Sequence, residues 1–303
     1  MRALEKRKIA DTNEYVTFIG LGALEIGRDW GLGDENERKK PPLEEVGRFL
    51  NAILDLGINL IDTARAYHRS EERIGMFISH RRKEFFLASK CGEHSKEPDT
   101  YYDFSYNAIK KSIDLSLKLL KTDYIDLMQI HFGPDAEKVL KNGEVIEAIL
   151  DAQKEGKIKY LGASCWGNIA EKCISMGIFK VMQLSYNLLY QQERKTIKKC
   201  YEKNISVFVK SPLAYGKLSP KGVKYLNSIG KKHREKIKKL LQLVDNDPIK
   251  LMGLNLNFLY KTKGITSVLI GTKNIIHFKE ALNSLETDFS KNILEKAISI
   301  CQN

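Results

Sequence analysis

The stretch Phe85-Phe86-Leu87-Ala88-Ser89-Lys90 is an apolar run that ends in a lysine. Two further segments have the same form, Asn59-Leu60-Ile61-Asp62 and Leu127-Met128-Gln129-Ile130-His131. Near-continuous apolar runs of this length predict strands that are buried on both faces of a parallel sheet. The polar residue that ends each run would then lie at the carboxyl edge of the sheet, where (β/α)8 barrels build their active sites.

Strand-like and helix-like segments alternate along the chain from residue 18 onward. We expect strands at residues 18–24, 59–63, 85–90, 125–131, 160–164, 181–186, 207–213 and 267–270. The helices between them show apolar spacing of three and four residues, with Ser70 opening one helix and Asp247-Pro248 another. Eight such units favour a closed (β/α)8 TIM barrel over a doubly wound open sheet.

Three further features complete the expected fold. Residues 7–16 are expected to form an N-terminal hairpin that closes the bottom of the barrel, and residues 289–300 an extra C-terminal helix. A long loop follows the seventh strand. No linker divides the 303 residues, so we expect a single barrel domain spanning residues 1–303.

Composition narrows the class of protein. Hydrophobic residues make up 43% of the chain, which permits a sizeable core, and no run predicts a transmembrane helix. The N-terminal residues lack the apolar segment of a signal peptide, so we expect a cytoplasmic protein. The five cysteines are scattered and contain no Cys-x-x-Cys, so neither a disulfide framework nor a metal site is predicted.

The net charge of +12 is concentrated in the lysine-rich segment 221–239. Such a segment can bind nucleic acid through its phosphates. No recognition motif accompanies it, so we interpret it as a solvated loop and helix and expect no nucleic-acid partner and no membrane partner. A positive field could still attract a phosphorylated cofactor.

Asp62, Tyr67, Lys90 and His131 together form a proton-donating set. A phenol in water has a pKa of about 10 and is a poor acid near neutrality. A nearby ammonium favours the phenolate, and a carboxylate keeps that ammonium charged and in place. A histidine can orient a substrate oxygen or relay a proton.

The order of motifs resembles the aldo-keto reductase family over about residues 15 to 290. The motifs are Asp62-Thr63-Ala64-Arg65-Ala66-Tyr67, Ser70-Glu71-Glu72-Arg73-Ile74-Gly75, Lys90, Gln129-Ile130-His131, Gly162-Ala163-Ser164, Ser211-Pro212-Leu213 and Ile270-Gly271-Thr272-Lys273-Asn274. The resemblance implies a barrel that binds NADPH without a Rossmann fold, and no Gly-x-Gly-x-x-Gly fingerprint occurs here. It also implies hydride transfer between the nicotinamide and an aldehyde or ketone, or the reverse with an alcohol. Tyr67 would donate the proton, Lys90 paired to Asp62 would lower the tyrosine pKa, and His131 would orient the carbonyl oxygen.

The resemblance also implies a cofactor site. Ser164 and Gln183 would hold the nicotinamide carboxamide, Lys210 would contact the cofactor phosphates, and Lys273 would bind the 2′-phosphate that distinguishes NADPH. Cys165 stands where the family usually has Asn, His277 where many members have Arg, and Ala281 where many have Asn. The remaining implied cofactor residues are Gly22, Ser211, Pro212, Leu213, Gly271, Thr272 and Glu280.

Loops after the strands are expected to line a pocket for a small carbonyl or alcohol substrate. Trp30, Phe132 and Trp166 are the candidate substrate-binding residues. Cys91, next to Lys90, is interpreted as buried and inert rather than reactive. A non-catalytic barrel that senses a cofactor or binds a partner is the alternative, because of the substitutions at Cys165, His277 and Ala281.

Overall fold

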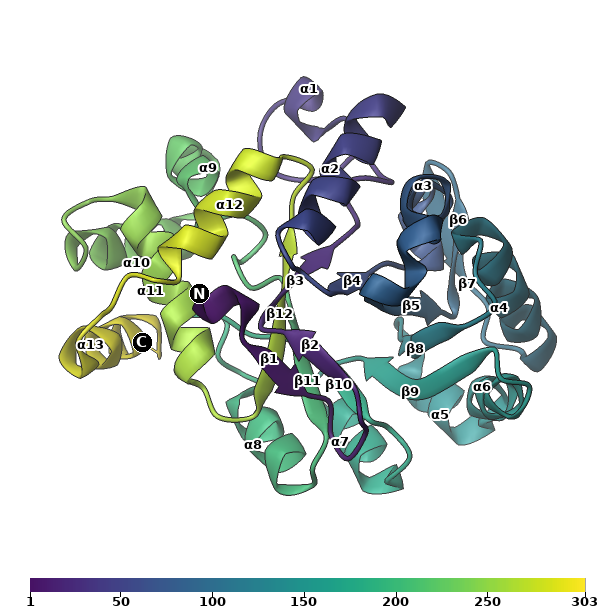
Figure 1. Ribbon diagram of the computed structural model, residues 1–303. Coiled ribbons are helices and arrows are strands. Elements are labelled where there is room, and N and C mark those ends of the chain that lie inside the picture. Colours follow the sequence, from purple (N-terminus) through teal and green to yellow (C-terminus); the bar gives the residue numbers. More distant parts are fainter. Residues whose placement is uncertain (303) are drawn as a thin grey trace.

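Eight parallel strands form a closed barrel in the computed structural model, which describes residues 1–302 (Figure 1). The strands follow one another around the ring in chain order, and the last pairs with the first, with Gly271 opposite Gly22. They are β3 (Ile19–Gly22), β4 (Leu60–Asp62), β5 (Phe86–Cys91), β8 (Ile125–His131), β9 (Ile158–Ser164), β10 (Val181–Ser185), β11 (Ser206–Lys210) and β12 (Ile265–Gly271). The predicted (β/α)8 barrel is confirmed.

Helices surround the strands, with one major helix after each (Figure 1). They are α2 (Leu43–Asp55), α3 (Ser70–Ile78), α4 (Tyr106–Leu120), α6 (Glu144–Lys154), α7 (Gly167–Met176), α8 (Arg194–Glu202), α11 (Pro248–Lys261) and α12 (Ile275–Ser284). Asp247 caps α11 as predicted, because its carboxylate accepts from the N–H groups of Ile249 and Lys250. The predicted cap at Ser70 is wrong, since its hydroxyl donates to the carbonyl of Ala23 instead.

The N-terminal hairpin closes the end of the barrel at which the strands begin. β1 (Lys6–Lys8) and β2 (Tyr15–Thr17) pair antiparallel, as predicted. Ile9 and Val16 from this hairpin are fully buried against Leu60, Phe86 and other side chains that fill the barrel interior. Burying a large aliphatic side chain stabilises a fold by roughly 1.5–3 kcal/mol, so the hairpin is part of the core.

The connections between strands contain further elements, some of which were predicted and some not. After β5, β6 (Glu93–Lys96) and β7 (Asp99–Tyr102) form an antiparallel hairpin of mostly polar residues. The long loop after β11 contains α9 (Pro220–Lys224) and α10 (Lys231–Gln242), which together take up most of the lysine-rich segment. Two short helices, α1 (Glu35–Arg38) and α5 (Ala136–Asn142), complete the set, and α13 (Lys291–Gln302) confirms the extra C-terminal helix.

None of the helices within residues 1–302 combines the length and the hydrophobicity that crossing a membrane requires. Nor do three or more His, Cys, Asp or Glu side chains of the described residues converge as metal ligands.

Candidate functional site

A cavity of about 1480 Å³ opens where the barrel strands end. It exceeds the roughly 300–1,000 Å³ of pockets for drug-sized ligands. Most of the residues proposed from the sequence line it, namely Gly22, Trp30, Asp62, Tyr67, His131, Gln183, Lys210, Ser211, Pro212, Leu213, Gly271, Thr272, Lys273, His277 and Glu280. The cavity therefore has room for a dinucleotide together with a small substrate.

Lys90 lies fully buried behind the cavity and pairs with Asp62. Its ammonium donates to Oδ1 of Asp62 and, at 2.9 Å, to the carbonyl of Thr63. Gln129 and Gln183 donate to the other carboxylate oxygen, Oδ2, at 2.9 and 2.8 Å. Burial on its own would lower the pKa of Lys90, but Asp62 and Tyr67 together outweigh this effect and the pKa is raised. Lys90 is therefore a fixed positive charge.

Tyr67 faces this ion pair from a short 3-10 helix, Arg65–Tyr67. The Nζ atom of Lys90 lies 4.9 Å from the centre of the tyrosine ring, and the ring of His131 stands edge-on to it with centroids 6.3 Å apart. Burial raises the pKa of Tyr67, and the opposing effect of Lys90 is smaller. Lys90 thus lowers the pKa of Tyr67 as predicted, but burial raises it by more. The phenol is protonated at neutral pH, as a proton donor must be.

The segment that carries Tyr67 is held in place by contacts with Glu71 and with Gly27. The buried carboxylate of Glu71 accepts from Arg65 at 2.7 Å and from the Ser89 hydroxyl at 2.7 Å, which ties this segment to β5. Gly27 packs against it so closely that an added Cβ atom would lie 2.1 Å from the carbonyl oxygen of Tyr67. No larger residue fits at this position, so the loop after β3 is held directly beside the tyrosine.

Glu93, at the start of the β6–β7 hairpin, contacts the histidine of the site and was not predicted. Its Oε2 atom lies 2.9 Å from Nδ1 of His131, at the distance of an ion pair but outside the angle of a hydrogen bond. Thr100 donates to Oε1 of Glu93 at 2.7 Å. Burial lowers the pKa of His131, and Glu93 opposes this effect only in part. Because Nδ1 is buried against the hairpin, Nε2 is the ring nitrogen available to a ligand in the cavity.

Lys210 covers Ser164, one of the two residues implied to hold the nicotinamide carboxamide. Its ammonium donates to the Ser164 hydroxyl at 2.9 Å and lies 5.8 Å from the centre of the Trp166 ring. Burial, together with the charge of Lys90, lowers the pKa of Lys210 to about 8. Ser164 is fully buried and does not line the cavity.

The structure does not bring Cys165, Phe132 and Trp166 to the cavity. Cys165 is fully buried, and a contact with Cys173 of α7 together with burial raises its pKa. Phe132 is buried and stacks on Phe104 at 6.3 Å. Trp166 is 53% exposed beside Lys210, outside the cavity. Each of these residues directly follows or lies near a predicted site residue, but its side chain points elsewhere.

Cys91 also lies away from solvent, where burial raises its thiol pKa to about 12. The interpretation of this residue as inert is therefore supported.

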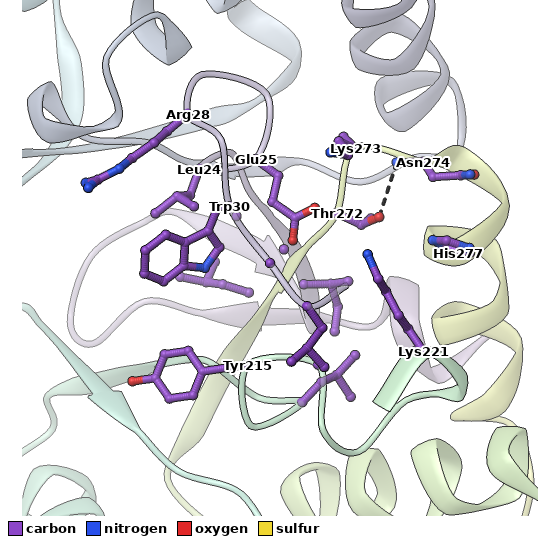
Figure 2. A pocket seen from close by; sticks show the side chains of 18 of the residues that line it. Leu24, Glu25, Arg28, Trp30, Tyr215, Lys221, Thr272, Lys273, Asn274 and His277 are labelled. Atoms are coloured by element: carbon purple, nitrogen blue, oxygen red, sulfur yellow. Dashed lines mark hydrogen bonds between the residues drawn. The ribbon is translucent and has the colours of Figure 1, made fainter. Parts of the chain in front are cut away.

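One side of the cavity carries the basic residues implied for a phosphate group (Figure 2). Asn274 caps α12 by accepting from the N–H of Ile276, and its own N–H donates to the Thr272 hydroxyl at 3.1 Å. Lys273 donates to the carbonyls of Glu37 and Lys39 across the cavity. The loop that contains α1 is thereby connected to the start of α12.

Glu37 is the acidic partner of the lysine-rich segment at this point. Its carboxylate lies 3.0 Å from Nζ of Lys224 and 3.6 Å from Nζ of Lys221. Lys221 also lines the cavity, on the same side as His277 (Figure 2). Part of the positive charge that the sequence assigns to a solvated surface therefore faces the candidate cofactor site.

The other side of the cavity carries Arg28, Trp30 and Tyr215 (Figure 2). Of these, only Trp30 was predicted. Arg28 and Tyr215 follow strands β3 and β11 in irregular segments, where no periodic pattern assigns a side chain to a face. Glu25 lies nearby, and burial raises its pKa to about 7 despite the opposing charges of Lys273 and Lys221.

Comparison with known proteins gives one family. The model of the Aldo/keto reductase family matches residues 18–300. The uncharacterized oxidoreductase YqkF of Bacillus subtilis is 26% identical over 313 residues, which cover 99% of this chain and 96% of the relative. The NADP(+) aldo-keto reductase yakc of Schizosaccharomyces pombe is 27% identical over 329 residues, which cover 99% of this chain and 92% of the relative. The holo form of the aldo-keto reductase AKR11C1 from Bacillus halodurans has the same fold, with a TM-score of 0.79, 24% identity and coverage of 98% of this chain and 95% of that one.

Proposed function

Because the chain belongs to the aldo/keto reductase family, we propose that it reduces an aldehyde or ketone to an alcohol with NADPH as its preferred coenzyme, or runs the reverse reaction. One observation carries the proposal. Tyr67, His131 and the Asp62–Lys90 ion pair come from four different strand ends or loops, and they meet at the floor of one large cavity. No packing requirement explains a charged pair and a phenol at this position.

We assign Tyr67 as the proton donor to the carbonyl oxygen. Its hydroxyl is protonated at neutral pH, since a phenol has a pKa of about 10 in water and burial raises it further. The adjacent Lys90 ammonium stabilises the phenolate that forms when the proton leaves. Asp62 holds Lys90 in place and keeps it charged. Nε2 of His131 lies on the cavity side of its ring and orients the substrate oxygen.

The residues present suit a nicotinamide dinucleotide phosphate. When bound, this coenzyme supplies the hydride for the carbonyl carbon. Lys273 and Lys221, beside the start of α12, provide cationic donors for a 2′-phosphate, and the His277 ring provides a further hydrogen-bonding group. Gln183 donates to Asp62 through its amide nitrogen, which leaves Oε1 to accept from a carboxamide N–H.

The five cysteines are free and buried, which supports our proposal that the protein works in the cytoplasm.

Titration of the purified protein with NADPH and with NADH, followed by quenching of protein fluorescence, tests the coenzyme assignment. We expect micromolar binding of NADPH and clearly weaker binding of NADH. A screen of aldehydes and ketones at 340 nm then tests turnover. Failure to bind either nucleotide, or binding without turnover of any carbonyl compound, would contradict the proposal and favour a non-catalytic, partner-binding barrel.

A further inference from the structure

Arg28 is a cation that lines the cavity and has no acidic partner among residues 1–302. It emerges from the loop after β3, directly after Gly27, whose backbone packs against the carbonyl of Tyr67. Its side chain is partly buried and lines the cavity. Among residues 1–302 its guanidinium makes no ion pair and no hydrogen bond, and its one side-chain contact of note is with the Trp30 ring, 5.7 Å from the centroid.

The acidic groups around Arg28 are engaged elsewhere. The charge of Arg28 contributes to lowering the pKa of Glu93. The carboxylate of Glu93, however, already contacts His131 and accepts a hydrogen bond from Thr100. Asp29 accepts from the backbone N–H of Lys40 at 2.8 Å and faces its ammonium at 3.9 Å. The pKa of Glu25, in the same loop, responds to Lys273 and Lys221 and not to Arg28. No carboxylate among residues 1–302 therefore forms an ion pair with Arg28.

The position of Arg28 separates it from the coenzyme phosphate site. Figure 2 shows Arg28 and Trp30 on one side of the cavity, and Lys221, Lys273 and His277 on the other. Arg28 instead lies on the side of the cavity where Gly27 packs against the loop of Tyr67. Its charge also acts on Glu93, which contacts His131. These are the groups that would surround a carbonyl substrate.

We propose that Arg28 binds a carboxylate of the substrate, so that the natural substrate is a small carbonyl compound with a carboxylic acid group. The inference rests on the proposed reductase function and specifies its substrate class. A guanidinium presents two parallel N–H donors that match a carboxylate. A single guanidinium suits a monoanion better than a phosphate dianion. Trp30 and Tyr215, both exposed, provide apolar walls for the body of such a molecule.

Matched pairs of substrates test the inference. The acids 4-formylbenzoate, 3-formylbenzoate and 4-oxobutanoate are each compared with their methyl esters at saturating NADPH. The wild-type protein is expected to reduce at least one acid with a kcat/KM about tenfold or more above that of its ester, because a charge-assisted hydrogen bond has roughly that effect. Arg28→Gln should abolish this preference, mainly by raising the KM for the acids. The kcat/KM for the esters and the KM for NADPH should stay within about twofold of the wild-type values.

Two further variants serve as controls. Arg28→Lys keeps the charge and should retain part of the preference. Arg234→Gln on α10 removes the same charge outside the cavity and should change nothing. Turnover of the esters without preference for any acid, or a preference that survives in Arg28→Gln, would overturn the inference while leaving the reductase assignment intact. If the wild-type protein turned over none of the acids and none of the esters, that result would instead overturn the proposed function, and this inference with it.

Discussion

Nδ1 of His131 lies 2.9 Å from Oε2 of Glu93, so the carboxylate holds the histidine ring from behind while Nε2 faces the cavity. A neutral ring with its proton on Nδ1 presents Nε2 as an acceptor. Protonation of the ring turns Nε2 into a donor for a carbonyl oxygen. The charge on Glu93 thereby sets the pH at which His131 can assist reduction.

Glu93→Gln is expected to move the pH profile of carbonyl reduction to lower pH. Burial lowers the pKa of His131 and Glu93 opposes that effect, so removing the negative charge lowers the histidine pKa further. Gln has nearly the same shape as Glu, so the variant removes the charge with little change in packing around the ring. Measuring kcat for reduction between pH 5 and 9 checks this prediction. If kcat falls at the same pH in the variant as in the wild-type protein, Glu93 does not control the protonation of His131.

Lys90→Met should reduce the free energy of unfolding by roughly 3–5 kcal/mol, because it leaves the buried carboxylate of Asp62 without its counter-charge. The double variant Lys90→Met/Asp62→Asn should recover part of that loss. Urea denaturation measures both effects. As a control, Lys198→Ala removes an exposed ion pair with Glu202 and should cost less than about 1 kcal/mol. A loss for Lys90→Met no larger than that of the control would contradict the prediction.

Lys273→Ala is expected to weaken NADPH binding about tenfold or more and to leave NADH within about twofold, because only NADPH has the 2′-phosphate. In the structure the Lys273 ammonium donates to two backbone carbonyls and forms no ion pair with a described residue, so its removal breaks no ion pair of the fold. Lys279→Ala, on the exposed face of α12, is the matched control. Equal effects of Lys273→Ala on the two coenzymes would remove this residue from the phosphate site.

Lys210 predicts a second pH dependence. Its pKa is lowered to about 8 by burial and by the charge of Lys90, so Lys210 is charged below that pH and neutral above it. The affinity for NADPH should therefore fall as the pH rises through about 8. Lys210→Arg retains the charge and should remove this fall. Fluorescence titrations at pH 7 and pH 9 decide the point, and an equal fall in the variant would exclude Lys210 as the responsible group.

The barrel and the residues at its strand ends were predictable because both follow from simple periodicity. Asp62, Lys90 and His131 end apolar runs, and parallel strands carry such residues to one edge. The misplaced candidates have an equally simple cause. Successive side chains on a strand point to opposite faces, so Phe132, which follows His131, turns away from the cavity. Cys165 instead contacts Cys173 of α7.

The irregular segments were not predictable in the same way. Glu93 lies in a polar hairpin without alternation, and Arg28 lies in a loop whose course depends on the close contact of Gly27 with Tyr67. Lys221 belongs to a lysine-rich segment whose contact with Glu37 joins residues far apart in the chain. Contacts of this kind depend on the tertiary structure and leave no local signal.

The proposed reaction depends above all on Tyr67 as the donor of the proton to the carbonyl oxygen. The most direct test is single-turnover oxidation of bound NADPH at 340 nm by wild-type protein and by Tyr67→Phe, with an aldehyde that the wild-type protein reduces. We expect the variant to react about 10²- to 10⁴-fold more slowly. Its affinity for NADPH should change by less than about twofold, because the ring is kept and only the hydroxyl is lost. A variant that reacts at the wild-type rate would show that Tyr67 does not donate the proton.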